Sequence, residues 1–156
     1  MKRVIVVILA TLAVLAPTTA VASAAPSPAY FSYNDWAGYV TLNSASKNSS
    51  EMTIDVTIEA TRGAVPVNPL YFFVKATDGT TYDYSWTGDS TLRAGNLPAG
   101  QKTRGTVTFD IAGGPEPTQV IYEAPLGEQL TSWTITWKPA PKPAPKQAAP
   151  FGSSAS

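Results

Sequence analysis

The stretch 51–61, EMTIDVTIEAT, decides the fold, because apolar and polar side chains alternate along it without a break. Successive side chains of a β-strand point to opposite faces of the sheet, so this alternation predicts a strand with one buried and one solvated face. At helical spacing the same apolar residues would be spread around the whole cylinder. The apolar members are Met52, Ile54, Val56, Ile58 and Ala60, and the acidic members of the other face are Glu51, Asp55 and Glu59.

Strand patterns continue on both sides of this stretch. The segment 69–76 is apolar on both faces, as expected of a central strand. Asp78-Gly79 lies between two strand patterns and predicts a hairpin. No helical pattern follows the N-terminal segment. The predicted strands besides 51–61 are 38–43, 69–76, 80–86, 103–111, 118–124 and 131–137.

About seven short strands in about 100 residues predict an all-β fold, an antiparallel immunoglobulin-like β-sandwich. A parallel sheet would need helices to cover its faces. The chain has no cysteine, so it lacks the disulfide mark of antibody domains and would belong to the wider immunoglobulin-like class. We place the domain at residues 37–138. A small closed barrel is the alternative.

The N-terminus has the pattern of a secretory signal peptide over residues 1–24. A basic start precedes an uncharged run over 4–16, and small residues with an A-x-A cleavage site end at Ala24. A membrane-spanning helix is the alternative, but it needs about 20 apolar residues and Pro17 interrupts the run. We expect a secreted, extracellular protein without stable membrane insertion after cleavage.

The two segments that flank the predicted domain are rich in proline. Residues 25–36, APSPAYFSYNDW, show no clean period, and we interpret them as a linker whose aromatic rings could lie against the domain. Residues 139–156 begin with a proline at every second position, which favours extended polyproline II. We expect a disordered, solvated tail there. The alternative is a basic spacer that contacts an anionic cell-wall or membrane surface.

The composition excludes several classes of enzyme. The chain contains no histidine and no cysteine, so Ser-His-Asp and Cys-His nucleophilic systems and the usual His/Cys zinc sites are impossible. Carboxylates remain, but those of the segment 51–61 fall on its solvated face, and the loop carboxylates lack the dense spacing of a calcium loop. We expect no enzymatic activity, no cofactor and no metal. A hydrolase that uses only carboxylates is a minor alternative.

The charge of the predicted domain argues against nucleic acid as a partner. Residues 25–137 carry six basic and eleven acidic side chains, a net charge of −5. Nucleic-acid affinity comes mainly from Lys and Arg side chains that neutralise phosphates. We therefore expect a partner other than nucleic acid.

The stretch 95–103, GNLPAGQKT, comes close to the phosphate-binding pattern G-x-x-x-x-G-K-[ST]. Gly95 and Gly100 have the required spacing. Gln101, however, separates the second glycine from the lysine, and Pro98 removes one amide donor. A phosphate-binding loop leads into a helix, whereas the residues that follow here alternate like a strand. We interpret the stretch as a structural turn and expect no nucleotide cofactor.

Aromatic side chains form the only candidates for a partner-binding site. Tyr82, Tyr84 and Trp86 alternate along one predicted strand, and Trp133 and Trp137 along another. Outside the sandwich such a stripe would bind a sugar or a protein, and inside it would be core. A small domain without disulfides needs large apolar side chains inside, so we expect the tryptophans in the core. Tyr82 and Tyr84 remain candidates for partner binding.

Four segments in order resemble a known family. They are TIEATRG (57–63), FFVKATDGTTYDYSW (72–86), LPAGQKTRGTVTFDIAGGPEP (97–117) and TITWKP (134–139). With them the chain resembles the secreted immunogenic antigen family of mycobacteria, the immunoprotective extracellular proteins. The resemblance implies a small exported protein with an immunoglobulin-like sandwich and no established enzymatic activity. It carries over no catalytic residues.

Two functions are therefore expected from the sequence. The first is a secreted, non-enzymatic immunoglobulin-like protein that binds a host or cell-surface protein. The alternative is a cell-wall-associated module that binds polysaccharide and is held by its basic, proline-rich tail.

Overall fold

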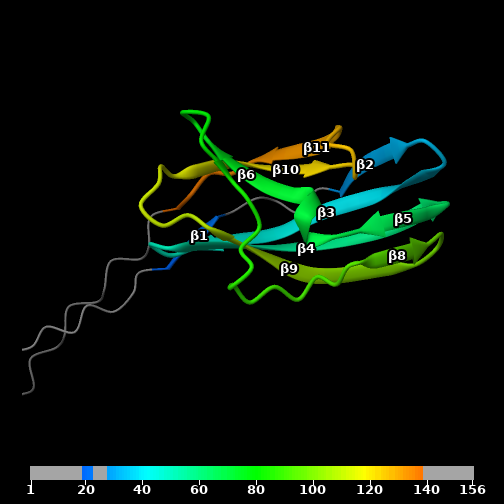
Figure 1. The fold of residues 1–156 in the computed structure, drawn as a ribbon, viewed down its shortest axis with the longest axis horizontal. Coiled ribbons are helices and arrows are strands. Elements are labelled where there is room, and N and C mark those ends of the chain that lie inside the picture. The colour runs from blue at the N-terminus through cyan, green and yellow to red at the C-terminus, as the bar shows by residue number, and fades with distance from the viewer. Residues whose placement is uncertain (1–18, 23–27, 139–156) are drawn as a thin grey trace, which may run out of the picture.

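The computed structural model of the chain describes residues 19–22 and 28–138. Its strands form two antiparallel sheets that face each other, with β6, β10 and β11 above β3, β4 and β9 in the view of Figure 1. The larger sheet holds β1 (Ala20–Ala22), β2 (Pro28–Tyr33), β3 (Trp36–Lys47), β4 (Glu51–Arg62) and β9 (Lys102–Asp110). The smaller sheet runs in the order β11 (Gln129–Thr134), β10 (Pro117–Glu123), β6 (Phe72–Ala76) and β7 (Thr81–Tyr82).

This arrangement confirms the predicted all-β, antiparallel immunoglobulin-like sandwich. The two sheets stay open, so the alternative of a closed barrel is wrong. A two-stranded ribbon of β5 (Ala64–Val67) and β8 (Gly95–Pro98) extends one end of the sandwich. In the described part of the chain the helical structure is a single 3-10 turn, η1 (Pro69–Tyr71). No helix of the described residues has the length and hydropathy needed to span a membrane.

Strand β4 lies inside the larger sheet and alternates as predicted. Its five apolar side chains from Met52 to Ala60 are 0–1% exposed, and the residues between them are partly exposed. It pairs with β3 on one side and with β9 on the other. The buried row meets the smaller sheet, whose inward side chains include Phe72, Val74, Val120 and Tyr122.

The stretch 95–103 is not a simple turn. It contains strand β8 and a short interruption at 99–101 before β9 begins. Gly100 has a φ of +82°, a conformation that glycine adopts without strain. Its amide donates to the Ala60 carbonyl at 2.7 Å, and the Ala60 amide donates to the Gln101 carbonyl at 3.0 Å. The ladder thus continues from β4 and β9 into β5 and β8. Because the Gly100 amide is used in this ladder, it is not free to hold a phosphate.

The predicted linker at 25–36 is wrong for its described part. Residues 28–33 form β2, which pairs with β3 from Pro28↔Thr41 to Tyr33↔Trp36. Phe31 is buried and meets the Trp36 ring edge-on, with 5.6 Å between the ring centroids. The alternation was hidden because aromatic residues stand on both faces of this strand. The folded part of the domain therefore begins before the predicted residue 37.

Gly38 allows β2 to pack so closely. It is the direct cross-strand partner of Phe31, and a Cβ atom at this position would lie 2.8 Å from the Phe31 ring and would also clash with the Glu59 carbonyl. The aromatic ring thus fills the space above the glycine.

The predicted signal peptide and tail lie mostly outside the described residues. Residues 1–18 and 139–156 are not described. Residues 20–22, inside the predicted signal peptide, form β1 and pair with the far end of β3, from Ala20↔Lys47 to Ala22↔Ala45.

Tyr122 is the largest fully buried side chain of the core. Its ring stacks on Phe72, with 4.7 Å between centroids, and meets Phe31 edge-on at 5.5 Å. Among the described residues its hydroxyl has no hydrogen-bond partner. Burial raises the pKa of this phenol far above its ordinary value.

Tyr122→Phe is expected to raise the free energy of unfolding by about 1 kcal/mol, because it removes an unpaired buried hydroxyl and keeps the ring. Tyr82→Phe is the matched control. Its hydroxyl donates to the Pro115 carbonyl at 2.7 Å, so its loss should cost about 1 kcal/mol. Urea unfolding of both variants measures the difference. A clear loss of stability in Tyr122→Phe would contradict the expectation.

Candidate binding surface

The segment after β7 crosses from the smaller sheet to the larger one. Tyr84 makes an isolated antiparallel bridge with Phe109 of β9. The buried Ser85 donates its amide to the Thr108 carbonyl at 2.8 Å, and its hydroxyl accepts from the Gly88 amide at 3.2 Å. Ser85 thus fixes the crossing segment against β9, whereas its neighbour Tyr84 is half-buried and its neighbour Trp86 is exposed.

The aromatic stripe predicted at 80–86 does not keep to one face. Tyr82 is 9% exposed and belongs to the core, whereas Trp86 is 79% exposed. The alternation of buried and exposed side chains breaks within this segment, because Tyr82 and Ser85 are three residues apart and both are buried. Tyr82 is therefore unsuited to partner binding, and Tyr84 is half-buried at the rim of a groove.

The prediction that the tryptophans lie in the core holds only in part. Trp36 is buried, and Trp133 and Trp137 are half-buried against the core. For Trp86 the prediction is wrong. The exposed position of Trp86 had no signal in the sequence, since the regular alternation of the segment placed it with Tyr82.

Trp86 stands at a groove of about 390 Å³, which we call the Trp86 groove. The Trp86 ring meets the Tyr84 ring nearly at right angles, with 5.2 Å between centroids. The lining contains two charged side chains, Asp83 and Glu123, and both are acidic. The lining residues are Leu70, Phe72, Phe73, Thr81, Asp83, Tyr84, Trp86 and Glu123.

The elements around the Trp86 groove hold its side chains in place. Leu70 belongs to η1, whose capping residue Asn68 accepts the Leu70 amide on its side chain at 3.0 Å. Phe73 and Lys75 are two residues apart on β6, and the Lys75 ammonium lies 5.6 Å from the centroid of the Phe73 ring. A cation thus already rests on one aromatic ring of the groove.

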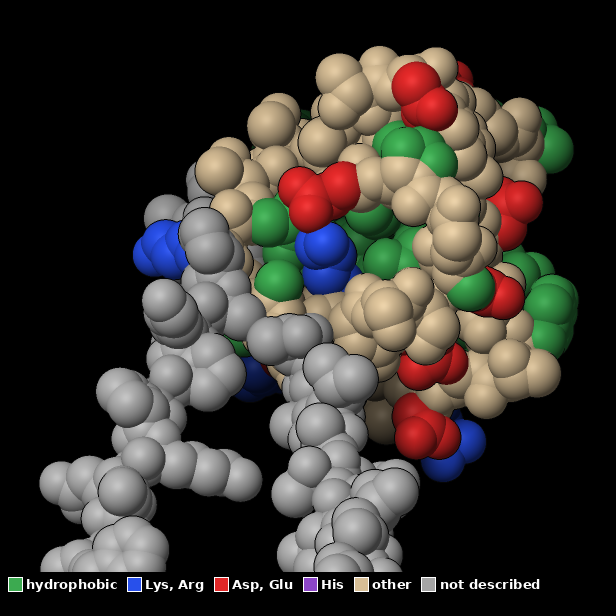
Figure 2. Space-filling view, turned by 90° about the vertical axis from the view of Figure 1, so that its left-hand side faces the viewer, with side chains coloured by type: hydrophobic (Ala, Val, Ile, Leu, Met, Phe, Trp, Pro, Cys, Tyr) green, Lys and Arg blue, Asp and Glu red, His purple; other side chains and the backbone are tan. Residues whose placement is uncertain are grey.

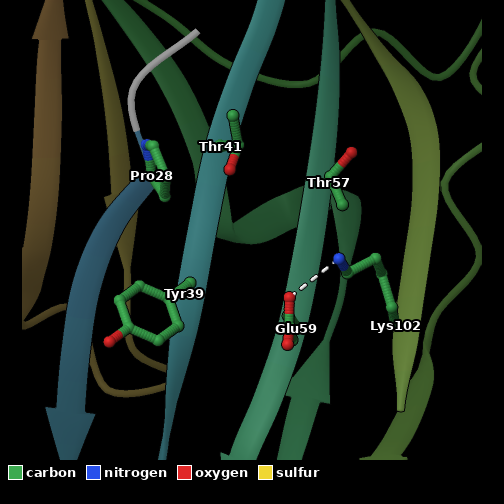
Figure 3. A pocket seen from close by; sticks show the side chains of 6 residues that line it. All are labelled: Pro28, Tyr39, Thr41, Thr57, Glu59 and Lys102. Carbon is green, nitrogen blue, oxygen red and sulfur yellow. Dashed lines mark ion pairs between the residues drawn. The ribbon is translucent and has the colours of Figure 1, made fainter.

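A second groove lies on the outer face of the larger sheet and is shown in Figure 3. We call it the Tyr39 groove. Its volume is about 290 Å³, and it is lined by Pro28, Tyr39, Thr41, Thr57, Glu59 and Lys102. Strand register sets these side chains in two rows. Pro28, Thr41 and Thr57 are successive cross-strand partners, and so are Tyr39, Glu59 and Lys102.

The Tyr39 groove is nearly neutral and carries an exposed aromatic pair. In Figure 3 Lys102 reaches toward Glu59, and their charged atoms are 2.8 Å apart. Tyr39 is 41% exposed and Tyr30 is 57% exposed, and their rings meet edge-on at 5.4 Å between centroids. Neither tyrosine stood out in the sequence, because Tyr30 fell in the predicted linker and Tyr39 in the predicted strand 38–43.

Asp55 continues this polar face along β4. The Arg104 guanidinium binds its carboxylate through two nitrogens, with Nε 3.0 Å from Oδ1. Asn43 donates to Asp55 at 3.1 Å and to the Thr57 hydroxyl at 2.9 Å. The Arg104 hydrogen bond, supported by that of Asn43, lowers the pKa of the Asp55 carboxyl.

The acidic residues of the described segments are dispersed. Among residues 19–22 and 28–138 no three potential ligands of the types His, Cys, Asp and Glu come together to hold a metal. Asp78 accepts hydrogen bonds from Thr80 within its own turn, and Glu116 pairs with Lys47 at 2.8 Å. On the end of the sandwich shown in Figure 2, acidic side chains are spread over the surface and basic ones stand singly.

Comparisons with known proteins agree with this fold. The family model described as "Domain of unknown function (DUF1942)" matches residues 40–133. A solved structure of a secreted protein from Mycobacterium tuberculosis, MPT63, is similar with a TM-score of 0.58 and 22% identity; the match covers 72% of this chain and 99% of that chain. No curated protein matches the chain.

The resemblance stated from four sequence segments is thereby confirmed at the level of fold and family. The family model spans the first three segments, 57–63, 72–86 and 97–117. The last segment, 134–139, follows the end of the model.

Asp55→Asn is expected to lower the urea midpoint of unfolding at pH 7. The folded pKa of Asp55 lies below its unfolded value of about 3.9. The contribution of Asp55 is therefore complete above the unfolded pKa and is lost as pH falls through the folded pKa. The difference in urea midpoint between the wild type and Asp55→Asn should therefore shrink in acid. Glu51→Gln, on the same face of β4, is the control. A gap that is constant between pH 7 and pH 3 would contradict this assignment.

Proposed function

The chain belongs to the family described as a domain of unknown function, DUF1942, and we propose that it is an exported, non-enzymatic protein that binds an extracellular or host protein through the Trp86 groove. Export is supported by the signal-peptide pattern of residues 1–24. It is also supported by the secreted mycobacterial protein that shares the fold.

The exposed Trp86 is the observation that carries this proposal. A tryptophan that is 79% exposed removes a large apolar surface from water when a partner covers it. Tryptophan and tyrosine are enriched at the hot spots of protein interfaces, and Tyr84 stands directly against Trp86. Leu70, also exposed, extends the apolar surface at the same groove.

A non-enzymatic role is supported by the residue types and by the state of the carboxylates. The sequence has no histidine and no cysteine for nucleophilic catalysis. Asp55 and Glu59, two of the three carboxylates of β4, are each bound in an ion pair, with Arg104 and Lys102 respectively. Two carboxylates committed to such pairs are poor candidates for the acid and base of a hydrolase.

Trp86→Ala is expected to weaken capture of a surface protein from host-cell extracts by about 2 kcal/mol, the size of a hot-spot contact. Immobilised wild-type protein and the variant are compared by the amount of each protein that they retain. Tyr30→Ala is the matched control, because it removes an exposed aromatic ring from the outer face of the other sheet. Equal capture by wild type and Trp86→Ala would contradict this function.

A second candidate function is supported by the Tyr39 groove. Sugar rings stack their C–H faces on aromatic rings, and their hydroxyls take hydrogen bonds from side chains such as those of Thr41 and Thr57. The ion pair of Glu59 and Lys102 leaves the groove nearly neutral, which suits an uncharged polysaccharide. The basic residues of 138–156 would add electrostatic attraction to an anionic envelope.

For this second function, deletion of 139–156 is expected to shift the protein from the cell envelope to the medium. Tyr39→Ala should weaken binding to isolated wall polysaccharide, whereas Trp86→Ala should leave it unchanged. Fractionation at low salt and co-sedimentation with purified polysaccharide measure the two effects. Complete recovery of the wild-type protein in the medium at low salt would exclude the wall module.

A further inference from the structure

The Trp86 groove combines aromatic rings with negative charge. Four rings line it, those of Phe72, Phe73, Tyr84 and Trp86, and Asp83 and Glu123 supply two carboxylates. The lining residues include no lysine or arginine. Lys75, whose ammonium lies 5.6 Å from the centroid of the Phe73 ring, is not among the lining residues. The chemistry of the groove therefore suits a ligand that is both apolar and positively charged.

Basic proline-rich segments have these two properties. A polyproline II helix presents flat proline rings, which pack on the aromatic side chains of a groove. The helix is already extended before it binds, so little conformational entropy is lost on docking. Lysines between the prolines meet the carboxylates, which select a basic segment over a neutral one.

The chain carries such a segment directly after its last strand. Residues 138–147 read KPAPKPAPKQ, with a proline at every second position from 139 to 145 and lysines at Lys138, Lys142 and Lys146. The segment is positive and holds no acidic residue, whereas the lining of the Trp86 groove is negative.

The segment is also long enough to reach the groove of its own molecule. The indole of Trp137 donates to the Pro117 carbonyl at 2.6 Å, so the chain leaves the domain beside the first residue of β10. Glu123, at the groove, is the last residue of the same strand. At about 3.3 Å per strand residue the two ends of β10 are roughly 20 Å apart. The segment 138–147 spans roughly 30 Å at about 3.1 Å per residue of polyproline II.

We propose that the Trp86 groove binds basic proline-rich segments in the polyproline II conformation, and that its resident occupant is the chain's own segment 138–147. This inference rests on the proposed function in that both use the Trp86 groove. A protein partner then has to displace the segment, so its apparent affinity is its intrinsic affinity multiplied by the fraction of molecules in which the groove is free.

The absence of cysteine from the chain gives a direct test. Ala148→Cys provides a single thiol for a nitroxide label, and the indole N–H signals of the four tryptophans are recorded by NMR on the full purified chain. Trp86→Phe assigns the Trp86 signal. With the nitroxide oxidised, the Trp86 signal should lose most of its intensity relative to the reduced label. It should recover in 1 M salt, where screening acts within about 3 Å.

Charge-changing variants separate specific docking from chance proximity. Lys142→Glu with Lys146→Glu should restore the Trp86 signal, and Lys142→Arg with Lys146→Arg, which keeps the charge, should leave it broadened. A Trp86 signal that is the same with oxidised and reduced label overturns the proposal. So does broadening that persists in the Glu variant.

Mixing identifies the molecule that supplies the segment. An isotope-labelled chain without the introduced cysteine is combined with an unlabelled, nitroxide-labelled chain. Broadening of Trp86 in this mixture would assign the segment to a second copy and overturn docking within one chain. If broadening is seen in the single chain but no protein is captured through Trp86, the inference stands and the proposed function fails. Capture without broadening overturns the inference alone.

Discussion

The sandwich depends on the burial of one face of β4. With no cysteine in the chain, no disulfide joins the two sheets, and β4 brings five consecutive inward side chains to the packed contact between them. The same alternation points Thr57 and Glu59 outward, where they line the Tyr39 groove. The position of that surface is thus a direct consequence of the core, because a shift of one residue in register would exchange the two faces.

The sequence predicted the elements whose alternation is undisturbed. The burial pattern of β4 and the hairpin at Asp78-Gly79 follow from local chemistry alone. Strand β2 was missed because Tyr30 and Phe31 are both aromatic although they face opposite ways. The exposure of Trp86 depends on a segment that crosses between the sheets and is fixed by the hydrogen bond of Ser85 to the distant Thr108. The alternation of residues in the sequence does not indicate such a contact.

The two grooves lie on opposite outer faces of the molecule. The Trp86 groove is aromatic and acidic and belongs to the smaller sheet, while the Tyr39 groove is polar and nearly neutral and belongs to the larger one. The packed core lies between the two sheets, and the two linings share no residue, so a substitution in one groove leaves the side chains of the other in place.

Strand β1 covers part of one edge of the larger sheet, and cleavage of the predicted signal peptide would remove it. Its residues pair with Ala45–Lys47 of β3 and lie on the N-terminal side of the cleavage site expected after Ala24. Cleavage there would remove β1 and leave backbone amide and carbonyl groups of β3 unpaired, which is the template that another strand can extend.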